Sequence, residues 1–217
     1  MPDPQWLARQ LRRPSGDDAA EVGRNMNASN GPLNLRCIAQ LACTAGDRVL
    51  EIGPGNGGFV RPLLEAAPAL DYTGVDWSDA MVVEARAGNA DLVAAGRVRF
   101  LQGSSAALPF ADAAFDRVLA VHTLYFWEPP APHLTEIARV LRQGGRLCIA
   151  FGDAGFMRGL PFTAHGFRLY TLEHARETIA AAGLCVLDAV AHRESGLSNT
   201  GGTVDKLVHI LRCERPG

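Results

Sequence analysis

The sequence is poor in the residues and patterns that mark several large classes of protein. Its 217 residues include a single lysine, Lys206, and the formal net charge is only −2. Non-specific binding to nucleic acid needs an excess of positive charge, so we expect no nucleic-acid partner. A P-loop ends in Gly-Lys-Ser/Thr, but in the glycine-rich segment of this chain Gly58 is followed by Phe59. This excludes P-loop nucleotide chemistry.

Cysteine pairs and long apolar runs are also missing. The five cysteines are odd in number, and none has a second cysteine two or three residues away: Cys37, Cys43, Cys148, Cys185 and Cys213. Zinc sites and disulfide scaffolds usually need such pairs, so we expect free, buried thiols and no metal. No window approaches the roughly 20 apolar residues of a membrane span, and the N-terminus has no signal-peptide run. We therefore expect a soluble cytoplasmic protein with no membrane span.

The first 45 residues read as a helical segment. A short apolar stripe contains Trp6, Leu7 and Leu11, and a longer one runs over residues 33–42, with Pro32 expected in the first turn of that second helix. Residues 24–31 between the stripes are too polar for a core and rich in asparagine. We treat residues 1–45 as a separate segment that precedes a domain over residues 46–217.

From residue 46 onward, strand-like and helix-like segments alternate. The expected strands cover residues 48–53, 71–76, 97–102, 115–121 and 145–151, and the expected helices cover 58–67, 79–90 and 131–142, with Ser78 as an N-cap. This alternation predicts an α/β fold with a doubly wound parallel sheet. A helix near 172–182 and strands near 184–193 and 203–213 follow, separated by Gly201-Gly202. Because no crossover helix fits between these strands, we expect an antiparallel hairpin.

A glycine-rich turn and an acidic strand end carry the main functional signal. Residues 51–58, Glu-Ile-Gly-Pro-Gly-Asn-Gly-Gly, follow the first strand, where glycines let the backbone approach a ligand. Asp76 ends the second strand, where a carboxylate can accept hydrogen bonds from both ribose hydroxyls. Together they predict a nucleoside site at the switch point of the sheet.

An NAD site is the competing interpretation, because Gly53, Gly55 and Gly58 also fit Gly-x-Gly-x-x-Gly. Against it, Glu51 stands where a dinucleotide fingerprint normally has an apolar residue. The only lysine is preceded by Gly202 at the position where Tyr-x-x-x-Lys would need tyrosine. The expected hairpin also replaces the second mononucleotide half. An NAD-linked oxidoreductase therefore ranks second.

Further motifs show a specific resemblance. The glycine turn, Asp76, the segment Leu-Pro-Phe-x-Asp-x-x-Phe-Asp over residues 108–116 and Arg-Val-Leu-Arg-x-Gly-Gly over residues 139–145 occur in the expected order. Over about residues 45–190 the chain resembles the class I S-adenosylmethionine-dependent methyltransferases, in the small-molecule branch of the ubiquinone and menaquinone methylases. That resemblance implies a Rossmann-like α/β fold with seven strands, an antiparallel last strand and N-terminal helices.

The resemblance also implies roles in binding S-adenosylmethionine. Residues Gly53, Gly55 and Gly57 would line its methionine and ribose portions, and Glu51 would orient the loop or bind the amino group. Asp76 would take the ribose hydroxyls, with Trp77 beside the adenine. The family usually has Gly-Asp-Ala after the third strand, whereas this chain has serines, Ser104 and Ser105. The change weakens the adenine contact, which backbone groups of the two serines would supply instead. This departure is the one feature that favours a non-catalytic S-adenosylmethionine-binding module.

On the acceptor side, Val121 and His122 close the fourth strand, where the family packs residues against the sulfonium and the substrate. A histidine suits a base for a phenol or hydroxyl acceptor. Tyr125, with its neighbours in Tyr-Phe-Trp, would form an aromatic wall for a flat or quinone-like small molecule. Three asparagines before the first strand are candidates for a lid over the cofactor, although the preferred interpretation is that they serve as helix caps and turn residues: Asn25, Asn27 and Asn30. His133 is expected in a surface or structural role.

Overall fold

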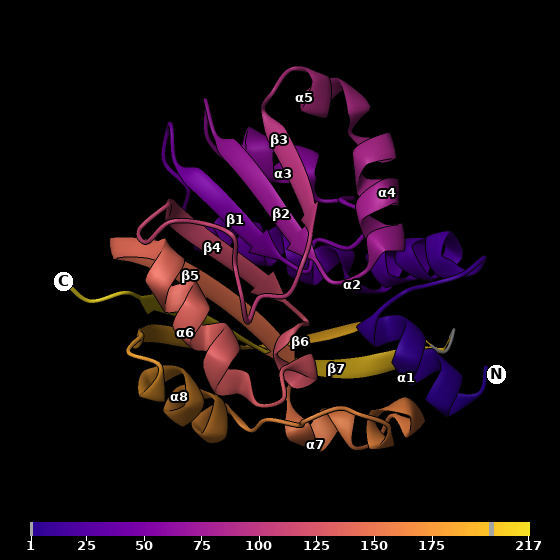
Figure 1. Cartoon of the computed structure of the whole chain (residues 1–217). Coiled ribbons are helices and arrows are strands. Elements are labelled where there is room, and N and C mark those ends of the chain that lie inside the picture. Colours follow the sequence, from indigo (N-terminus) through magenta and orange to yellow (C-terminus); the bar gives the residue numbers. More distant parts are fainter. Residues whose placement is uncertain (1, 200–201) are drawn as a thin grey trace.

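One sheet of seven strands organises the molecule, in the order β3-β2-β1-β4-β5-β7-β6 (Figure 1). The computed structural model describes residues 2–199 and 202–217. The strands are β1 (Arg48–Ile52), β2 (Asp71–Asp76), β3 (Val98–Gln102), β4 (Phe115–Val121), β5 (Leu141–Gly152), β6 (Cys185–Leu197) and β7 (Thr203–Glu214). The first five run parallel, and β7 pairs antiparallel with both β5 and β6. The predicted Rossmann-like sheet with an antiparallel last strand is confirmed.

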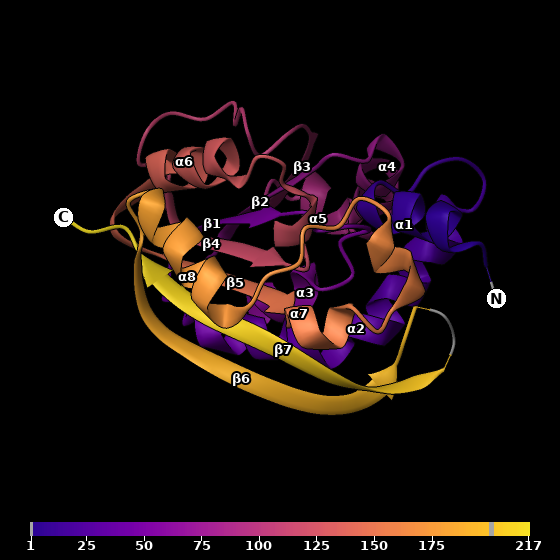
Figure 2. The ribbon, with the colours of Figure 1, turned by 90° about the horizontal axis from the view of Figure 1, so that it is seen from below.

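Helices cover both faces of the sheet (Figures 1 and 2). They are α1 (Pro4–Arg12), α2 (Ala19–Leu41), α3 (Val60–Glu65), α4 (Asp79–Gly88), α5 (Ala90–Ala94), η1 (Leu124–Phe126), α6 (Pro130–Val140), α7 (Ala154–Met157), η2 (Pro161–Ala164) and α8 (Leu172–Ala181). Side chains of α2, α3 and α4 share one buried cluster with the strands, and those of α6 and α8 share another. Ser78 caps α4 as predicted, since its Oγ accepts the N–H of Met81 at 3.2 Å.

The N-terminal region differs from the expectation. Helix α2 begins at Ala19 and runs through the polar stretch, so the prediction that Pro32 lies in the first turn is wrong. The polar residues are tolerated because Asn27, Asn30 and Asn34, three and four positions apart, lie on one face that borders a cavity. The apolar half of α2, including Leu33 and Leu41, is buried against the sheet.

The hairpin is longer than the sequence indicates. Strand β6 continues to Leu197, and β5 pairs with β7 only as far as Val208. Residues 203–206 of β7 therefore pair with β6 alone, and this extension curves past α2 (Figure 2). Of the two glycines expected in the turn, Gly201 lies outside the described residues.

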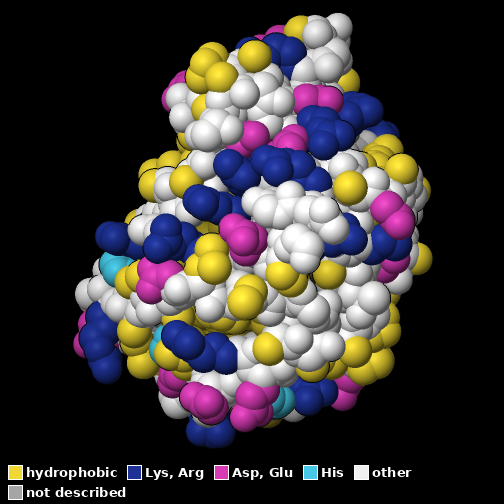
Figure 3. Space-filling view, turned by 90° about the vertical axis from the view of Figure 1, so that its left-hand side faces the viewer, with side chains coloured by type: hydrophobic (Ala, Val, Ile, Leu, Met, Phe, Trp, Pro, Cys, Tyr) yellow, Lys and Arg dark blue, Asp and Glu magenta, His cyan; other side chains and the backbone are white. Residues whose placement is uncertain are grey.

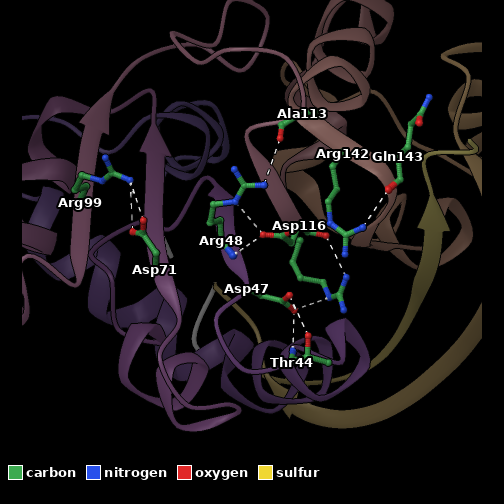
Figure 4. A network of polar contacts seen from close by, with 10 residues as sticks. Thr44, Asp47, Arg48, Asp71, Arg99, Ala113, Asp116, Arg142 and Gln143 are labelled. Atoms are coloured by element: carbon green, nitrogen blue, oxygen red, sulfur yellow. Dashed lines mark hydrogen bonds and ion pairs between the residues drawn. The ribbon is translucent and has the colours of Figure 1, made fainter.

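A polar network joins β1 to β4 at the end of the sheet where their strands begin (Figure 4). Asp116 accepts the backbone N–H of Arg48 at 2.9 Å and its Nε–H at 3.0 Å. Arg117 Nε lies 3.2 Å from Asp47 Oδ2, and both side chains are 8% exposed. Because β1 and β4 are parallel, this network fixes their register at the end opposite to the glycine turn.

The distribution of surface charge, the lengths of the helices and the burial of the cysteines can be compared with the remaining expectations. On the face in Figure 3, basic side chains are interspersed with acidic ones. None of the described helices has both the length and the apolar character that crossing a membrane requires. All five cysteines are free, but Cys185 is exposed and Cys43 partly so, which corrects the expectation that all are buried. Cys185 is the first residue of β6, and Cys43 follows α2 and packs against the edge of a buried cluster.

Candidate active site

A cavity of about 330 Å³, here called the larger cavity, opens where β1, β2 and β4 end. Nine of the residues expected at the site line it: Glu51, Gly53, Gly55, Asp76, Trp77, Ser104, Ser105, Val121 and His122. The carboxyl ends of parallel strands meet at one edge of a sheet, and this explains why residues far apart in sequence converge here. Gly57 and Tyr125, also expected at the site, are not part of this lining.

The glycine turn is shaped by close contacts. Gly53 has φ +72°, and a Cβ on it would lie 2.6 Å from the Thr123 side chain. Gly55 has φ +57° and no atom within 4 Å of an added Cβ, so its backbone faces open space. Both residues have a left-handed backbone, which favours glycine. At Gly53 the Thr123 side chain also leaves no room for a Cβ, whereas at Gly55 the backbone conformation is the only constraint.

Gly57 supports the turn from the side of α4. It has φ +70°, and a Cβ there would come within 2.9 Å of Asn89 Nδ2 and 3.0 Å of Phe100. Asn89 Nδ2 donates to the carbonyl oxygens of Gly57 and Ala85, at 3.2 and 3.0 Å. The glycine thus lets the turn dock on α4, away from the cavity.

Asp76 is the acidic group of the larger cavity. Its carboxylate accepts the Gly55 N–H at 2.9 Å and the Ser78 N–H at 2.8 Å, and the residue is 8% exposed. Burial raises the pKa of this carboxyl, although the two backbone donors oppose the shift. The same side chain therefore joins the glycine turn to the end of β2 and borders the cavity.

Glu51 is a buried carboxyl beside Asp76. Burial raises the pKa of Glu51 to about 7, against the hydrogen bond of 2.6 Å that Tyr72 Oη donates to its Oε2. Tyr72 lies wholly inside the protein. Glu51 is thus held in one orientation and takes up a proton near neutral pH.

Two arginines of the N-terminal segment cover Trp77. The guanidinium carbons of Arg12 and Arg13 lie 5.4 and 5.0 Å from the centre of its ring, within cation–π range. Trp77 is 44% exposed, and Arg12 also lines the larger cavity. The indole therefore has one face against basic groups at the rim of this cavity.

The two serines after β3 have different surroundings. Ser105 Oγ lies 2.7 Å from Nδ1 of His133, whose ring stacks on Trp127 with a centroid distance of 5.2 Å. Ser104 Oγ accepts the backbone N–H of Ala106 at 3.2 Å. His133 lines the larger cavity, whereas it was expected in a surface or structural role.

His122 follows β4 directly in a left-handed conformation, with φ +57°. Its Nδ1 is hydrogen-bonded to Tyr125 Oη. Burial, with a smaller contribution from the positive charge of Lys206, lowers the pKa of His122 to about 4. Burial also raises the pKa of Tyr125, so its phenol keeps its proton. The pair is neutral at pH 7.

A second cavity of about 80 Å³, here called the smaller cavity, adjoins the first. Its wall includes apolar and aromatic side chains that follow β4 and β5: Phe126, Phe156, Met157, Leu160, Phe162 and Phe167. Tyr125 lines it, whereas Trp127 lines only the larger cavity. The expected aromatic wall is therefore divided between the cavities. His122 belongs to both linings.

Several lining residues were not expected from the sequence. Arg12, Asn34 and His133 border the larger cavity and Lys206 the smaller one. Of the lid candidates, Asn27 borders the larger cavity and Asn30 borders both. The helical spacing of Asn27, Asn30 and Asn34 is a signal that would have found a polar face. Asn25 is exposed and absent from both linings. The described part of the chain holds no group of three or more His, Cys, Asp or Glu side chains placed to bind a metal ion.

Comparison with known proteins identifies the family. A family model described as a methyltransferase domain matches residues 50–149. Over 128 residues the chain is 33% identical to YdaC of Bacillus subtilis, an uncharacterized methyltransferase, covering 59% of this chain and 68% of YdaC. The chain belongs to the class I S-adenosylmethionine-dependent methyltransferases. The resemblance seen in the motifs is thereby confirmed.

Other methyltransferases share the same region. The chain is 38% identical to the O-methyltransferase rstn1 of Aspergillus nomiae, over 65% of this chain and 61% of that protein. It is 32% identical to a demethylmenaquinone methyltransferase of Beutenbergia cavernae, over 70% of this chain and 62% of that protein. The chain spans about half to two thirds of the length of the first curated relatives that it matches.

A solved structure supports the methyltransferase fold independently. A chain of the complex between the Haloferax volcanii Trm112 methyltransferase activator and a methyltransferase superposes with a TM-score of 0.76. It covers 94% of this chain and 99% of that one at 22% identity. S-adenosylmethionine is the cofactor of this family, and the larger cavity fits it chemically. It offers buried carboxylates, an aromatic ring at the rim and the open backbone at Gly55.

Proposed function

We propose that this protein transfers the methyl group of S-adenosylmethionine to a small, largely apolar acceptor. The observation that carries the proposal is the position of His122 in the lining of both cavities. One cavity has the polar groups that a nucleoside and an amino acid need, and the other is mainly apolar. A group in both linings is placed to act on an acceptor atom that meets the methyl donor.

The larger cavity would hold the cofactor through three sets of groups. Asp76 would accept hydrogen bonds from the ribose hydroxyls, and Glu51 would orient the loop or bind the amino group. The backbone of Gly53 and Gly55 would lie along the methionine and ribose portions, with Gly57 behind them. At the other end Trp77 would lie beside the adenine, with polar contacts from Ser104 and Ser105. Val121 would pack near the sulfonium.

The cofactor supplies an electrophilic methyl group, whose C–S electron pair stays on sulfur when the acceptor atom bonds to carbon. The chain then contributes mainly positioning, which is worth about 7–11 kcal/mol in well-oriented reactions. His122 is neutral at pH 7 because burial lowers its pKa to about 4. If Nδ1–H donates to Tyr125 Oη, Nε2 has a free lone pair that can accept the proton of an acceptor hydroxyl. Tyr125 would thus orient the ring of His122.

An aromatic or quinone-like acceptor is part of the proposal. It is supported by the rings around the smaller cavity, where Phe167 lies 4.7 Å from Phe126 and 5.5 Å from Tyr125 between ring centroids. The similarity to a demethylmenaquinone methyltransferase agrees with such an acceptor. Helices α1 and α2, which contribute Leu11, Met26 and Asn30 to both linings, would act as the lid. Free thiols favour a reducing, cytoplasmic setting.

Calorimetry followed by an acceptor screen tests the proposal. S-adenosylhomocysteine should bind the wild-type protein. When a phenolic acceptor is added, the protein should convert S-adenosylmethionine to S-adenosylhomocysteine. His122→Ala should lower kcat by about 100-fold or more, while Tyr125→Phe should lower it less. Nitrogen-15 NMR of His122 should report a proton on Nδ1. Binding without turnover for every acceptor would indicate a non-catalytic module, and binding of NADH in place of S-adenosylhomocysteine would indicate an oxidoreductase.

A further inference from the structure

The smaller cavity has one cationic side chain in its lining, Lys206, the only lysine of the chain. Lys206 is 7% exposed and belongs to the hairpin extension. It shares a face of β7 with Val204 and Val208, which line the same cavity. The larger cavity does not include these three residues. Lys206 therefore borders the smaller cavity, together with His122, but not the larger one.

The hydrogen bonds of Lys206 leave donor capacity for a ligand. An ammonium group has three N–H donors. Nζ donates to the carbonyl oxygen of Ser29, and Ser29 Oγ lies 3.3 Å away. Glu194 Oε1 is 3.8 Å from Nζ, beyond hydrogen-bond distance. Among the described residues, one N–H of Lys206 thus has no acceptor within hydrogen-bond reach, on a side chain that borders the cavity.

The charge around Lys206 indicates what kind of group it can take. Glu194 faces it directly across the hairpin, and the side chain of Glu194 is only 14% exposed. His192 Nε2 lies 3.3 Å from the other oxygen of Glu194. The carboxylate therefore already balances the ammonium, and a ligand carboxylate would add a second negative charge close to Glu194. An uncharged oxygen accepts an N–H without that repulsion.

A purely structural role explains only part of these contacts. Lys206 joins the hairpin to α2 through Ser29, whose Oγ also donates to the Leu197 carbonyl at 2.7 Å. Such a brace does not account for the remaining N–H on a side chain that borders the cavity, nor for Asn199 Oδ1 in the same lining, which has no hydrogen-bond partner among the described residues. A brace also predicts no discrimination between ligands that differ only in one oxygen.

We propose that Lys206 makes the smaller cavity selective for phenolic acceptors with a second, uncharged oxygen, such as a ketone. The phenol lies at His122, and the second oxygen accepts an N–H from Lys206. This inference rests on the proposed function and names the acceptor class of the same site. It assigns Lys206 to substrate binding, in addition to its contacts with Ser29.

Three single-ring phenols of similar size test the selectivity: 4-hydroxyacetophenone, 4-ethylphenol and 4-hydroxybenzoate. Each is titrated by calorimetry into the full-length protein loaded with S-adenosylhomocysteine. The ketone should bind about tenfold more tightly than 4-ethylphenol, since a hydrogen bond to a charged group is worth about that factor or more. The carboxylate should bind no better than 4-ethylphenol because of Glu194.

Two variants and a matched control sharpen the test. Lys206→Met should remove the preference for the ketone and leave 4-ethylphenol nearly unchanged. Glu194→Gln removes the balancing charge without shortening the side chain, and should favour the carboxylate over the ketone by about tenfold. Arg193→Met removes one positive charge from an exposed neighbouring position outside both linings, and should preserve the order of all three.

The outcomes separate this inference from the proposed function. If S-adenosylhomocysteine itself fails to bind, the proposed function is wrong. If it binds but the wild-type protein shows equal affinity, or none, for the three phenols, the role of Lys206 is wrong. An unchanged order in Glu194→Gln would overturn the charge argument. Thermal unfolding shows whether Lys206→Met is folded, and Glu194→Gln keeps the test decisive if it is not.

Discussion

The two cavities differ in how the chain builds them. The larger cavity is formed mostly by short segments that directly follow β1, β2, β3 and β4, each close to its strand in sequence. The smaller cavity joins α2, the segments after β4 and β5, and the hairpin, so that Ser29 meets Lys206 from 177 positions away. A site at strand ends is built from short sequence motifs, so it can be predicted from consecutive residues. A site between distant elements depends on how those elements pack.

The largest expected effect concerns the local, cofactor side. Asp76→Ala should lower the affinity for S-adenosylhomocysteine by about 1,000-fold. The reason is that the ribose hydroxyls and the N–H groups of Gly55 and Ser78 all lose a hydrogen-bond acceptor. Calorimetry measures this loss. Asp112→Ala, at a side chain that is 75% exposed, serves as a control and should not change the affinity. Less than a tenfold loss in Asp76→Ala would show that Asp76 has no direct contact with the cofactor.

Glu51 should give the larger cavity a distinct pH dependence. Its pKa rises from an ordinary 4.5 to about 7 in the folded protein. The folded state therefore binds more protons than the unfolded state between these values, and stability falls as pH rises through this window. The loss is on the order of 3 kcal/mol. Urea unfolding at pH 5 and pH 8 should show this fall in the free energy of unfolding for the wild-type protein, and a much smaller fall for Glu51→Gln. If the stability of the wild-type protein and of Glu51→Gln changed with pH in parallel, Glu51 would not be the cause of the pH dependence.

The junction of the cavities can be probed through His122. Because burial and Lys206 lower its pKa to about 4, kcat/KM should rise as pH passes this value and then level off. Lys206→Met removes a nearby positive charge, so the acid limb should move to higher pH and lower the rate severalfold near pH 5. Arg193→Met should leave the limb in place. A limb near the ordinary histidine value in wild type would mean that another group controls the reaction.

The smallest effect is expected at the edge of the larger cavity. Ser105→Ala removes the partner of His133 Nδ1 and should lower the free energy of unfolding by about 1 kcal/mol. The affinity for S-adenosylhomocysteine should change less than about threefold, because the backbone of Ser105, which would supply its contact with the adenine, is unchanged and His133 keeps its stacking on Trp127. Chemical denaturation and calorimetry check the two values. A large loss of affinity without loss of stability would place Ser105 itself on the adenine.

Much of the fold was predictable because its signals are local. Strands β4 and β5 contain continuous apolar runs, and the helix that begins after Ser78 shows its cap in the sequence. The error at Pro32 has a physical cause: a polar stretch was taken to interrupt a helix, whereas its amides face a cavity. The length of β6 was also missed, because past Arg193 the hairpin extends beyond β5, so that the β7 residues it pairs with have no second neighbouring strand.

The sequence by itself determined the α/β order, the glycine turn, the carboxylates at the ends of β1 and β2, and the family. These are properties of consecutive residues, since backbone conformation and strand ends are set within a few positions. Only the tertiary structure decided that Gly57 supports the turn from behind, that His133 reaches the larger cavity, and that Lys206 shares a cavity with His122. Such contacts depend on the packing of distant elements, which composition and spacing do not encode.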